Sequence, residues 1–371
     1  MTRDEVSKKV IDLYNSCNGH VLAVITMGMG KTRTALKILD SDHEHLKLIL
    51  THTVNSRDKT WPDEMNEVDI HPPLLEIHQF DKVSALINDY KIIVVDECHL
   101  ITEPLFKFLA RYSNSARILF MTGTLPDNVI KMQWLRFFKA NTIQYTFLQA
   151  LEDGNINNIE FHIVYVDFDT VEKKYKVPFR PGLYTESDAY FQHCVNVQNS
   201  TAKTKDMHVN NRMWFIYKSE TKTKAAIYIR NHLISENKRN ITFTTTKEIA
   251  DKISENVHYS GCKNSKLDDF QSYQINDLVS INQMKVGANL EGLRYMVAQQ
   301  INSKMHDFMQ MVNRTTRQGN DDVTSTVYII VARNTMDVSW MVNATRNIPK
   351  SLVKEYHLSQ EKLNTIQWRL D

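Results

Sequence analysis

Residues 21–32 read VLAVITMGMGKT, and most of the architecture can be worked out from this segment. Its first half is a run of β-branched and apolar residues, which is typical of a strand buried on both faces of a parallel sheet. Gly28 and Gly30 end that run, and a helical pattern begins at Lys31. A glycine loop between a strand and a helix is a setting in which backbone N–H groups bind phosphate oxygens.

The polar residues at the end of this loop fit the same chemistry. The Lys31 ammonium would reach the β- and γ-phosphates, and the Thr32 hydroxyl would hold Mg²⁺. The strict phosphate-loop pattern has its first glycine where this chain has Ile25, so a glycine-rich turn with a chance lysine is the alternative. In the phosphate interpretation, the ATP-binding residues of the loop are Met27, Gly28, Met29, Gly30, Lys31, Thr32 and Arg33.

The alternation of strands and helices extends along the chain on both sides of a weaker middle region. Further strand candidates lie at 46–50, 92–95, 118–122, 241–244, 278–281, 294–298 and 327–331. Helical patterns separate most of them. Short buried strands that alternate with helices predict a doubly wound α/β fold with mostly parallel sheets.

Length and composition limit the class of protein. A chain of 371 residues is long enough for about two domains. Hydrophobic residues at 42% and charged residues at 24% exclude a mainly disordered or fibrous protein. No run approaches the roughly 20 apolar residues of a membrane span, and the N-terminus carries both signs of charge. We therefore expect neither a membrane segment nor a secretion signal.

Charge and cysteine placement restrict the partners and the compartment. A net charge of +2 means that any nucleic-acid binding would need a local groove instead of bulk charge. The segment 203–239 is more basic than acidic, and it either adds phosphate contacts or is the solvated face of an insertion. The cysteines are far apart, without metal-ligand spacing, which suits a reducing compartment such as the cytoplasm.

An acidic pair follows the strand candidate at 92–95. Asp96 and Glu97 would stand at the carboxyl end of a buried strand, which is where ligands bind in α/β sheets. Asp96 would be a Mg²⁺ ligand, and Glu97 would polarise an attacking water molecule and so act in catalysis. The alternative is an ordinary strand exit with solvated acids, but the phosphate loop upstream favours the functional interpretation.

A phosphate loop followed by Asp-Glu-x-His resembles the superfamily 2 helicases and translocases. The segment 122–124, Thr-Gly-Thr, follows another strand and is similar to that family's third motif. The longer string 121–128, with Trp134 after it, looks more like the Swi/Snf branch than the DEAD-box branch, as do Trp61 and Glu64. Segments similar to the fourth, fifth and sixth motifs lie at 240–250, 287–290 and 310–317.

The sixth segment carries Arg314 and Arg317, which are three residues apart and share one face of a helix. The resemblance implies that they stabilise charge on the γ-phosphate as arginine fingers, whereas a lone pair of this kind is usually a solvated basic face. Two departures stand out. Asn313 replaces the family's usual glycine, and no glutamine precedes Lys31 to select adenine.

The resemblance implies two RecA-like lobes with the ATP site in the cleft between them. Lobe 1 would span residues 1–150, lobe 2 would span 151–345 with an inserted segment near 175–235, and 346–371 would be a helical C-terminal segment. Matching motif positions imply coupling residues His99, Thr122, Gly123 and Thr124, further ATP contacts at Gly287 and Gln310, and nucleic-acid contacts at Thr51, Thr53, Thr244, Thr245 and Asn289.

Together these features predict an enzyme that hydrolyses ATP with Mg²⁺ to move along nucleic acid. Duplex DNA is the favoured track, and replication, recombination or repair proteins are expected partners. An RNA helicase of the same superfamily and a weakly hydrolysing nucleotide switch remain alternatives. The compactness suggests a viral or phage enzyme acting in the host cytoplasm, or one that works inside a larger complex.

Overall fold

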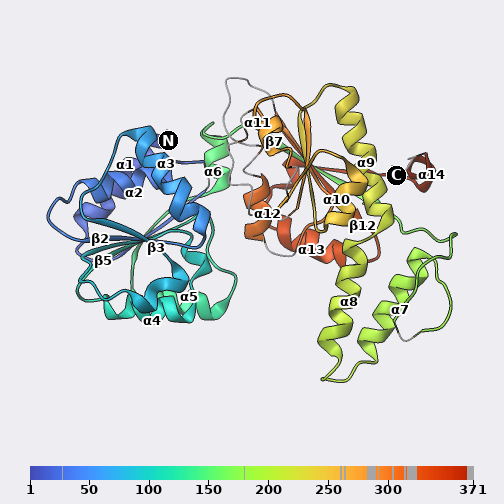
Figure 1. The fold of residues 1–371 in the computed structure, drawn as a ribbon, viewed down its shortest axis with the longest axis horizontal. Helices are drawn as coiled ribbons and strands as arrows, with labels where there is room; N and C mark the ends of the chain where they lie inside the picture. Colours follow the sequence, from blue (N-terminus) through green and yellow to red (C-terminus); the bar gives the residue numbers. More distant parts are fainter. Residues whose placement is uncertain are drawn as a thin grey trace. The chain divides into compact units, whose positions relative to one another are not determined.

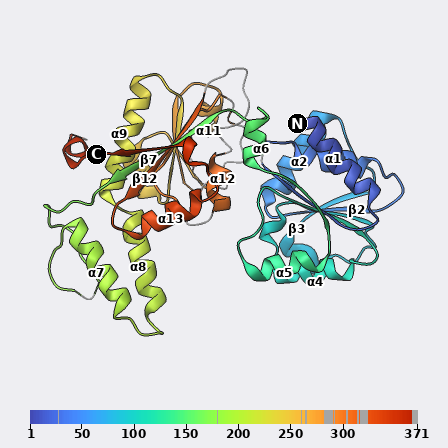
Figure 2. The same cartoon turned by 180° about the vertical axis from the view of Figure 1, so that it is seen from behind.

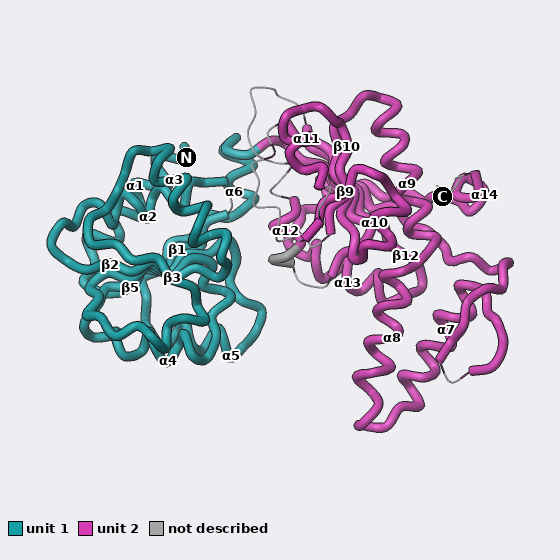
Figure 3. Tube along the Cα trace, in the orientation of Figure 1, with its two compact units in different colours: residues 1–156 teal, residues 157–371 magenta. Residues whose placement is uncertain are grey.

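The chain folds into two compact units, Met1–Ile156 and Asn157–Asp371 (Figure 3). The computed structural model describes residues 1–26, 28–178, 180–259, 261–262, 265–281, 290, 292–302, 305–312, 315 and 324–365, with backbone only at 305–307. The boundary falls after residue 156 because Ala150 and Ile156 are buried in the core of the first unit. The Asn155 side chain also donates a hydrogen bond to the Met1 carbonyl at 2.5 Å.

The first unit is built on a six-stranded sheet in which every pairing is parallel. Its order is β3-β2-β4-β5-β1-β6. The strands are β1 (Val21–Ile25), β2 (Lys47–Thr51), β3 (Leu75–Gln79), β4 (Ile92–Val95), β5 (Arg117–Thr122) and β6 (Asn141–Tyr145). All residues of β2 and β4 are buried, as the continuous apolar runs of central parallel strands require.

Helices cover both faces of this sheet (Figure 1). Ile49 of β2 points to one face, which is covered by α1 (Arg3–Ser16), α2 (Lys31–Asp40), α3 (Trp61–Val68) and α6 (Phe147–Glu152). Its neighbours Leu48 and Leu50 point to the other, which is covered by η2 (Phe80–Ala85), α4 (Glu103–Arg111) and α5 (Val129–Phe137). A π-helical turn, η1 (Ser56–Thr60), precedes α3, and a 3-10 turn, η3 (Cys98–Leu100), follows β4.

The second unit contains a seven-stranded sheet, also parallel throughout, in the order β13-β7-β12-β11-β8-β10-β9. Its strands are β7 (Ile159–Val166), β8 (Asn240–Thr244), β9 (Val257–His258), β10 (Asp277–Ile281), β11 (Tyr295–Ala298), β12 (Ser325–Ala332) and β13 (Val353–His357). Two doubly wound parallel sheets are thus present, as the sequence predicts.

One face of the second sheet is covered by α9 (Glu220–Ser235), α10 (Lys247–Ile253) and α14 (Gln360–Asn364). On the other face, Phe308 of α12 (Met305–Val312) lies against Phe161 of β7, with ring centroids 6.0 Å apart. The α13 helix (Met336–Thr345) packs beside α12. The short α11 (Leu267–Gln271) and η4 (Lys350–Leu352) complete the described elements of this unit.

The segment that projects from the second sheet contains fewer residues than the insertion predicted near 175–235. The α7 helix (Glu186–Gln198) and α8 helix (Lys205–Tyr217) pack together and extend away from the sheet (Figures 1 and 2). In contrast, α9 belongs to the core of the unit, where Ala225 and Leu233 are fully buried.

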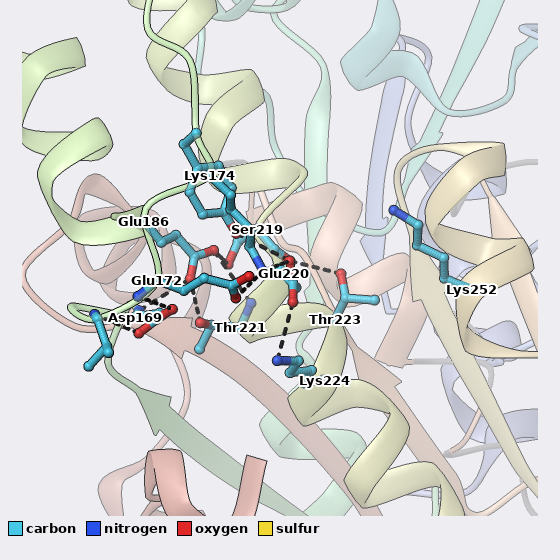
Figure 4. Close-up of polar contacts among 12 residues, drawn as sticks. Asp169, Glu172, Lys174, Glu186, Ser219, Glu220, Thr221, Thr223, Lys224 and Lys252 are labelled. Atoms are coloured by element: carbon cyan, nitrogen blue, oxygen red, sulfur yellow. Dashed lines mark hydrogen bonds and ion pairs between the residues drawn. The ribbon is translucent and has the colours of Figure 1, made fainter. Parts of the chain in front are cut away.

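A buried polar cluster fixes the start of α7 onto the start of α9. The Glu186 carboxylate accepts hydrogen bonds from the Ser219 hydroxyl at 2.7 Å, from the Thr221 hydroxyl, and from the Asp169 amide at 3.3 Å (Figure 4). Burial raises the pKa of Glu186. Beside it, Glu220 forms ion pairs with Lys174 at 2.7 Å and Lys224 at 3.2 Å.

The C-terminal segment differs from the helical segment predicted for 346–371. Residues Val353–His357 form β13, which pairs with β7, and only the short α14 follows among the described residues. The segment lacks an apolar stripe at helical spacing, and it can satisfy its backbone groups by joining the sheet edge. None of the helices that the structure describes is long and apolar enough to cross a membrane.

Candidate active site

The glycine loop after β1 is open to solvent at its two glycines. Gly28 and Gly30 have φ values of +81° and +73°, which favour glycine strongly. A Cβ atom at either position would meet nothing within 4 Å, so the space in front of the loop is free. Met29 between them is buried in the core and anchors the loop. The loop therefore presents backbone to open space, as phosphate binding requires.

Lys31 and Thr32 begin α2 at the end of this loop. The Lys31 ammonium donates a hydrogen bond to the Ile25 carbonyl at 3.1 Å, which holds it over the loop. Thr32 is half-buried. Thr34 fixes the helix start through a hydrogen bond between its hydroxyl and that of Ser7, at 2.9 Å. The predicted phosphate contact Met27 lies outside the described residues.

Arg33 is directed elsewhere. Its guanidinium donates to the carboxylates of Glu64 and Glu67, both on α3, the second at 2.5 Å. The side chain of Arg33 therefore connects α2 to α3. This predicted ATP contact therefore has its side chain bonded to another helix.

Asp96 directly follows β4 and is held in place from two sides. Its amide donates to the Leu50 carbonyl at 2.9 Å, and its Oδ2 atom accepts from the indole N–H of Trp61 at 3.2 Å. Burial and the neighbouring Glu97 carboxylate raise the pKa of Asp96 to about 7, while the Lys31 ammonium acts to lower it. A divalent cation would stabilise the charged form of such a carboxylate, so the residues present fit the predicted Mg²⁺.

Glu97 has a left-handed backbone conformation, with φ +53° and ψ +48°. Such a conformation in a residue other than glycine costs on the order of 1–3 kcal/mol and tends to persist at functional sites. Its Oε2 atom lies 3.3 Å from Nδ1 of His99. The strained turn thus places the candidate base next to the histidine of the same motif.

His99 also contacts the Thr-Gly-Thr segment after β5. Its Nδ1 atom lies 2.9 Å from the Thr122 hydroxyl, which donates to the Thr124 carbonyl at 2.7 Å and accepts from the Thr124 amide at 3.3 Å. Because the single hydroxyl proton of Thr122 is directed at Thr124, we assign the proton on Nδ1 to His99. Lys131 of α5 reaches the His99 carbonyl at 3.5 Å.

These three segments lie at one edge of the first sheet. β4, β5 and β1 are neighbours, and all three are parallel. Their carboxyl ends therefore bring together the glycine loop, the acidic pair and the Thr-Gly-Thr segment. The pKa of His52, which follows β2, is lowered by partial burial and then by the charges of His99 and Lys131. The segment after β2 therefore approaches the same edge.

One viral relative and several solved structures resemble the chain. No protein-family model matches the chain. A probable helicase of African swine fever virus is 29% identical over 99 residues, which are 25% of this chain and 11% of that relative; a second isolate gives the same match. Only about a tenth of that relative's length is therefore matched.

Three solved structures share the fold across nearly the whole chain. The helicase domain of Pyrococcus furiosus Hef covers 91% of this chain and 96% of its own, with TM-score 0.52 and 16% identity. S. cerevisiae Dbp5, bound to RNA and ADP BeF3, covers 97% and 91%, with TM-score 0.56 and 12% identity. The ATP-dependent type ISP restriction-modification enzyme LlaBIII, bound to DNA, covers 97% and 31%, with TM-score 0.63 and 12% identity.

The chain therefore shares its fold with these proteins, one of which is a helicase domain. Within this fold, the predicted site residues Lys31, Asp96, Glu97, His99 and Thr122 lie at neighbouring strand ends of the first unit. Gly123 and Thr124 are half-buried in the turn after β5. The closeness to the Swi/Snf branch and the viral or phage origin stay predictions.

The predicted nucleic-acid contacts of the helicase fold divide into two groups. Thr51 and Thr244 are buried, and their hydroxyls donate to the Thr53 carbonyl at 3.3 Å and to the Gln299 side chain at 3.2 Å. Both hydroxyls therefore have partners within the chain, and nucleic-acid contacts at these two positions stay predictions. Thr53 is exposed, whereas Thr245 is half-buried and its hydroxyl oxygen is buried.

Most predicted site residues of the second unit cannot be placed. Gly287, Asn289, Arg314 and Arg317 lie outside the described residues. Gln310 is on α12 and is half-buried.

The described carboxyl edge of the second sheet holds a polar network that the sequence did not reveal. The Lys222 ammonium, fully buried, donates to Asp337 and to Gln300, each at 2.5 Å. Asp337 also accepts from the Gln300 side chain at 3.1 Å and from the Ala332 amide at 2.9 Å. Gln300 and Asp337 lie 78 and 115 residues after Lys222 in the chain, so no local sequence pattern could have predicted that they meet.

Proposed function

We propose that this chain is a motor that hydrolyses ATP, with Mg²⁺, to move along or remodel nucleic acid. The observation that carries the proposal is the convergence of the open glycine loop, Lys31, the acidic pair and the His99–Thr122 contact at one sheet edge. Each part has a use in phosphoryl transfer, and no other part of the described chain combines them.

The residues take the following roles in this proposal. The backbone of the glycine loop and Lys31 hold the phosphates, while Thr32 and Asp96 hold Mg²⁺, which neutralises charge on the phosphate oxygens. Glu97 orients the attacking water molecule and accepts its proton. His99 and Thr122 connect this carboxylate to the turn after β5, which is the route for coupling hydrolysis to polymer contact. Arg314 and Arg317 would supply the transition-state charge.

For the track, we propose duplex DNA. The support is the likeness of the string 121–128, with Trp61, Glu64 and Trp134, to the Swi/Snf branch. Proteins of the same fold include one bound to DNA and one bound to RNA, so the competing track is RNA.

Steady-state ATP hydrolysis with duplex DNA, single-stranded DNA or RNA tests the proposal. We expect duplex DNA to stimulate turnover most, and Glu97→Gln to bind ATP without turning it over. Glu103→Gln is the matched control, because Glu103 is exposed on α4 and pairs with Lys107, which is also exposed. If RNA alone stimulated turnover, RNA would replace duplex DNA as the proposed track. Low turnover with all three polymers would favour the nucleotide switch.

A further inference from the structure

Trp61 occupies an unusual place for a fully buried tryptophan. It is the first residue of α3, and its indole N–H donates to Oδ2 of Asp96 at 3.2 Å. Buried indole N–H groups generally find a hydrogen-bond partner, but here the partner is the carboxylate assigned to the metal. The Glu97 amide also hydrogen-bonds to this carboxylate, so Asp96 is held by a side chain and by the backbone.

The same helix also holds the phosphate side of the site. About one and two turns after Trp61, Glu64 and Glu67 bind the guanidinium of Arg33. Arg33 directly follows Thr32, the second residue assigned to the metal. A single helix of eight residues therefore contacts one predicted metal ligand, Asp96, and the residue that follows the other, Thr32.

The position of Trp61 depends on the wide turn that precedes it. The Trp61 amide donates to the Ser56 carbonyl, five residues back, which is the hydrogen bond that defines the π-helical turn. Single π-helical turns are rare and occur frequently at functional sites. A regular α-helical turn has one residue fewer between these groups, so it would rotate the indole away from Asp96.

We propose that Trp61 is a positioning residue for the metal ligand Asp96, placed by the π-helical turn Ser56–Thr60. The inference rests on the proposed function, because it needs a nucleotide-bound metal at Asp96. It extends that function to a residue that touches neither nucleotide nor metal. Residues that orient a metal ligand typically alter metal affinity by about 10–100-fold when changed.

The test compares Trp61→Phe with Trp134→Phe, a control in the same unit whose ring stacks on Phe106. Both variants remove an indole N–H, but only the first removes the bond to Asp96. Electron paramagnetic resonance with Mn²⁺ and saturating ADP would give the metal affinity. We expect Trp61→Phe to weaken Mn²⁺ binding by about 10-fold. ADP binding in EDTA should stay unchanged in both variants.

Equal Mn²⁺ affinity in Trp61→Phe and the wild type would overturn the inference. Equal loss of ADP binding with and without metal would also overturn it, because that outcome indicates general damage. If the wild type itself bound neither ADP nor Mn²⁺, the proposed function would fail first. The two failures are therefore distinguishable.

A measurement on the unchanged protein covers the case in which Trp61→Phe does not fold. The chain has five tryptophans, whose indole N–H signals can be assigned by changing the other four to Phe one at a time. In the ADP-bound wild type, Mn²⁺ should broaden the Trp61 indole signal far more than the others. Broadening of a different indole signal, or of none, would contradict the assigned geometry.

Discussion

The carboxyl edges of the two sheets are built from similar elements but treat their charged groups differently. At the first edge, the Lys31 ammonium donates to a backbone carbonyl, Asp96 is a half-buried carboxylate with a raised pKa, and Glu97 has a strained backbone conformation. At the described part of the second edge, Lys222 is enclosed between Asp337 and Gln300.

The difference shows which edge can accept a charged ligand. Buried charge is costly unless it is paired, and the second edge pairs its lysine within the unit. At the first edge, the Lys31 ammonium donates to a backbone carbonyl and the Asp96 carboxylate accepts from the Trp61 indole. The same type of sheet edge can therefore bind a charged ligand in one unit, whereas in the other unit its charged residues pair with each other.

Removing the lysine of the first edge should have the largest effect. Lys31→Ala is expected to lower ATP turnover by about 10²–10³-fold or more, because the developing phosphate charge loses its fixed cation. The measurement is steady-state hydrolysis, with Lys107→Ala on the exposed side of α4 as control. Normal turnover in Lys31→Ala would refute the phosphate-loop assignment.

Removing the lysine of the second edge should instead cost stability. Lys222→Met leaves Asp337 buried without its cation, so we expect a loss of about 3–5 kcal/mol in the free energy of unfolding. Urea denaturation measures it. Adding Asp337→Asn should recover part of the loss, and Lys224→Met, which removes a more exposed pair, should cost less than about 1 kcal/mol. A Lys222→Met protein as stable as the wild type would show that the network is dispensable.

The contact between His99 and the turn after β5 offers a smaller test. Thr122→Val removes the acceptor for His99 and for the Thr124 amide, at a cost of about 1–3 kcal/mol of stability. We expect polymer-stimulated turnover to fall more than basal turnover. Thr142→Val on exposed β6 is the control. Equal loss of both rates would argue against a coupling role.

The smallest expected effect is a pH dependence in the first unit. His20 accepts the Ile118 amide at Nδ1 and lies 3.1 Å from the Ser113 carbonyl through Nε2, and burial lowers its pKa below 6.5. The unfolded chain then binds the proton more readily, so the stabilisation is complete above pH 6.5. It is lost as pH falls from 6.5 toward the lower folded-state pKa.

Urea denaturation between pH 5 and 8 checks this expectation against His20→Asn, whose side-chain oxygen can accept from the same amide without titrating. One histidine changes the slope by at most about 1.4 kcal/mol per pH unit. Parallel pH profiles for the two proteins would mean that other groups dominate this window.

The sequence predicts the central strands well because their residues are apolar on both faces, as in β2 and β4. Edge strands are harder: β3 is half-buried throughout, and β13 exposes most of its side chains, so neither has a clear apolar run. The acidic pair could be placed from the rule that ligands bind at carboxyl strand ends.

Other parts of the site depend on distant partners. The Thr244 hydroxyl bonds to Gln299, which is 55 residues away in the chain, and the Trp61–Asp96 bond joins residues 35 apart. No local pattern contains that information. The pairing of Arg33 with α3 is likewise set by how two helices pack on the sheet.

The late strand β13 also affects how the protein behaves when shortened. It pairs with β7 from Val353 opposite Phe161 to His357 opposite Tyr165, and it presents Lys354 and Glu355 to solvent. Charged residues on an edge strand discourage pairing with other molecules. A chain cut before Val353 would uncover the mostly apolar β7 and its row of free backbone groups. Such fragments should self-associate as their concentration rises, whereas a chain that keeps residues through His357 should remain dispersed.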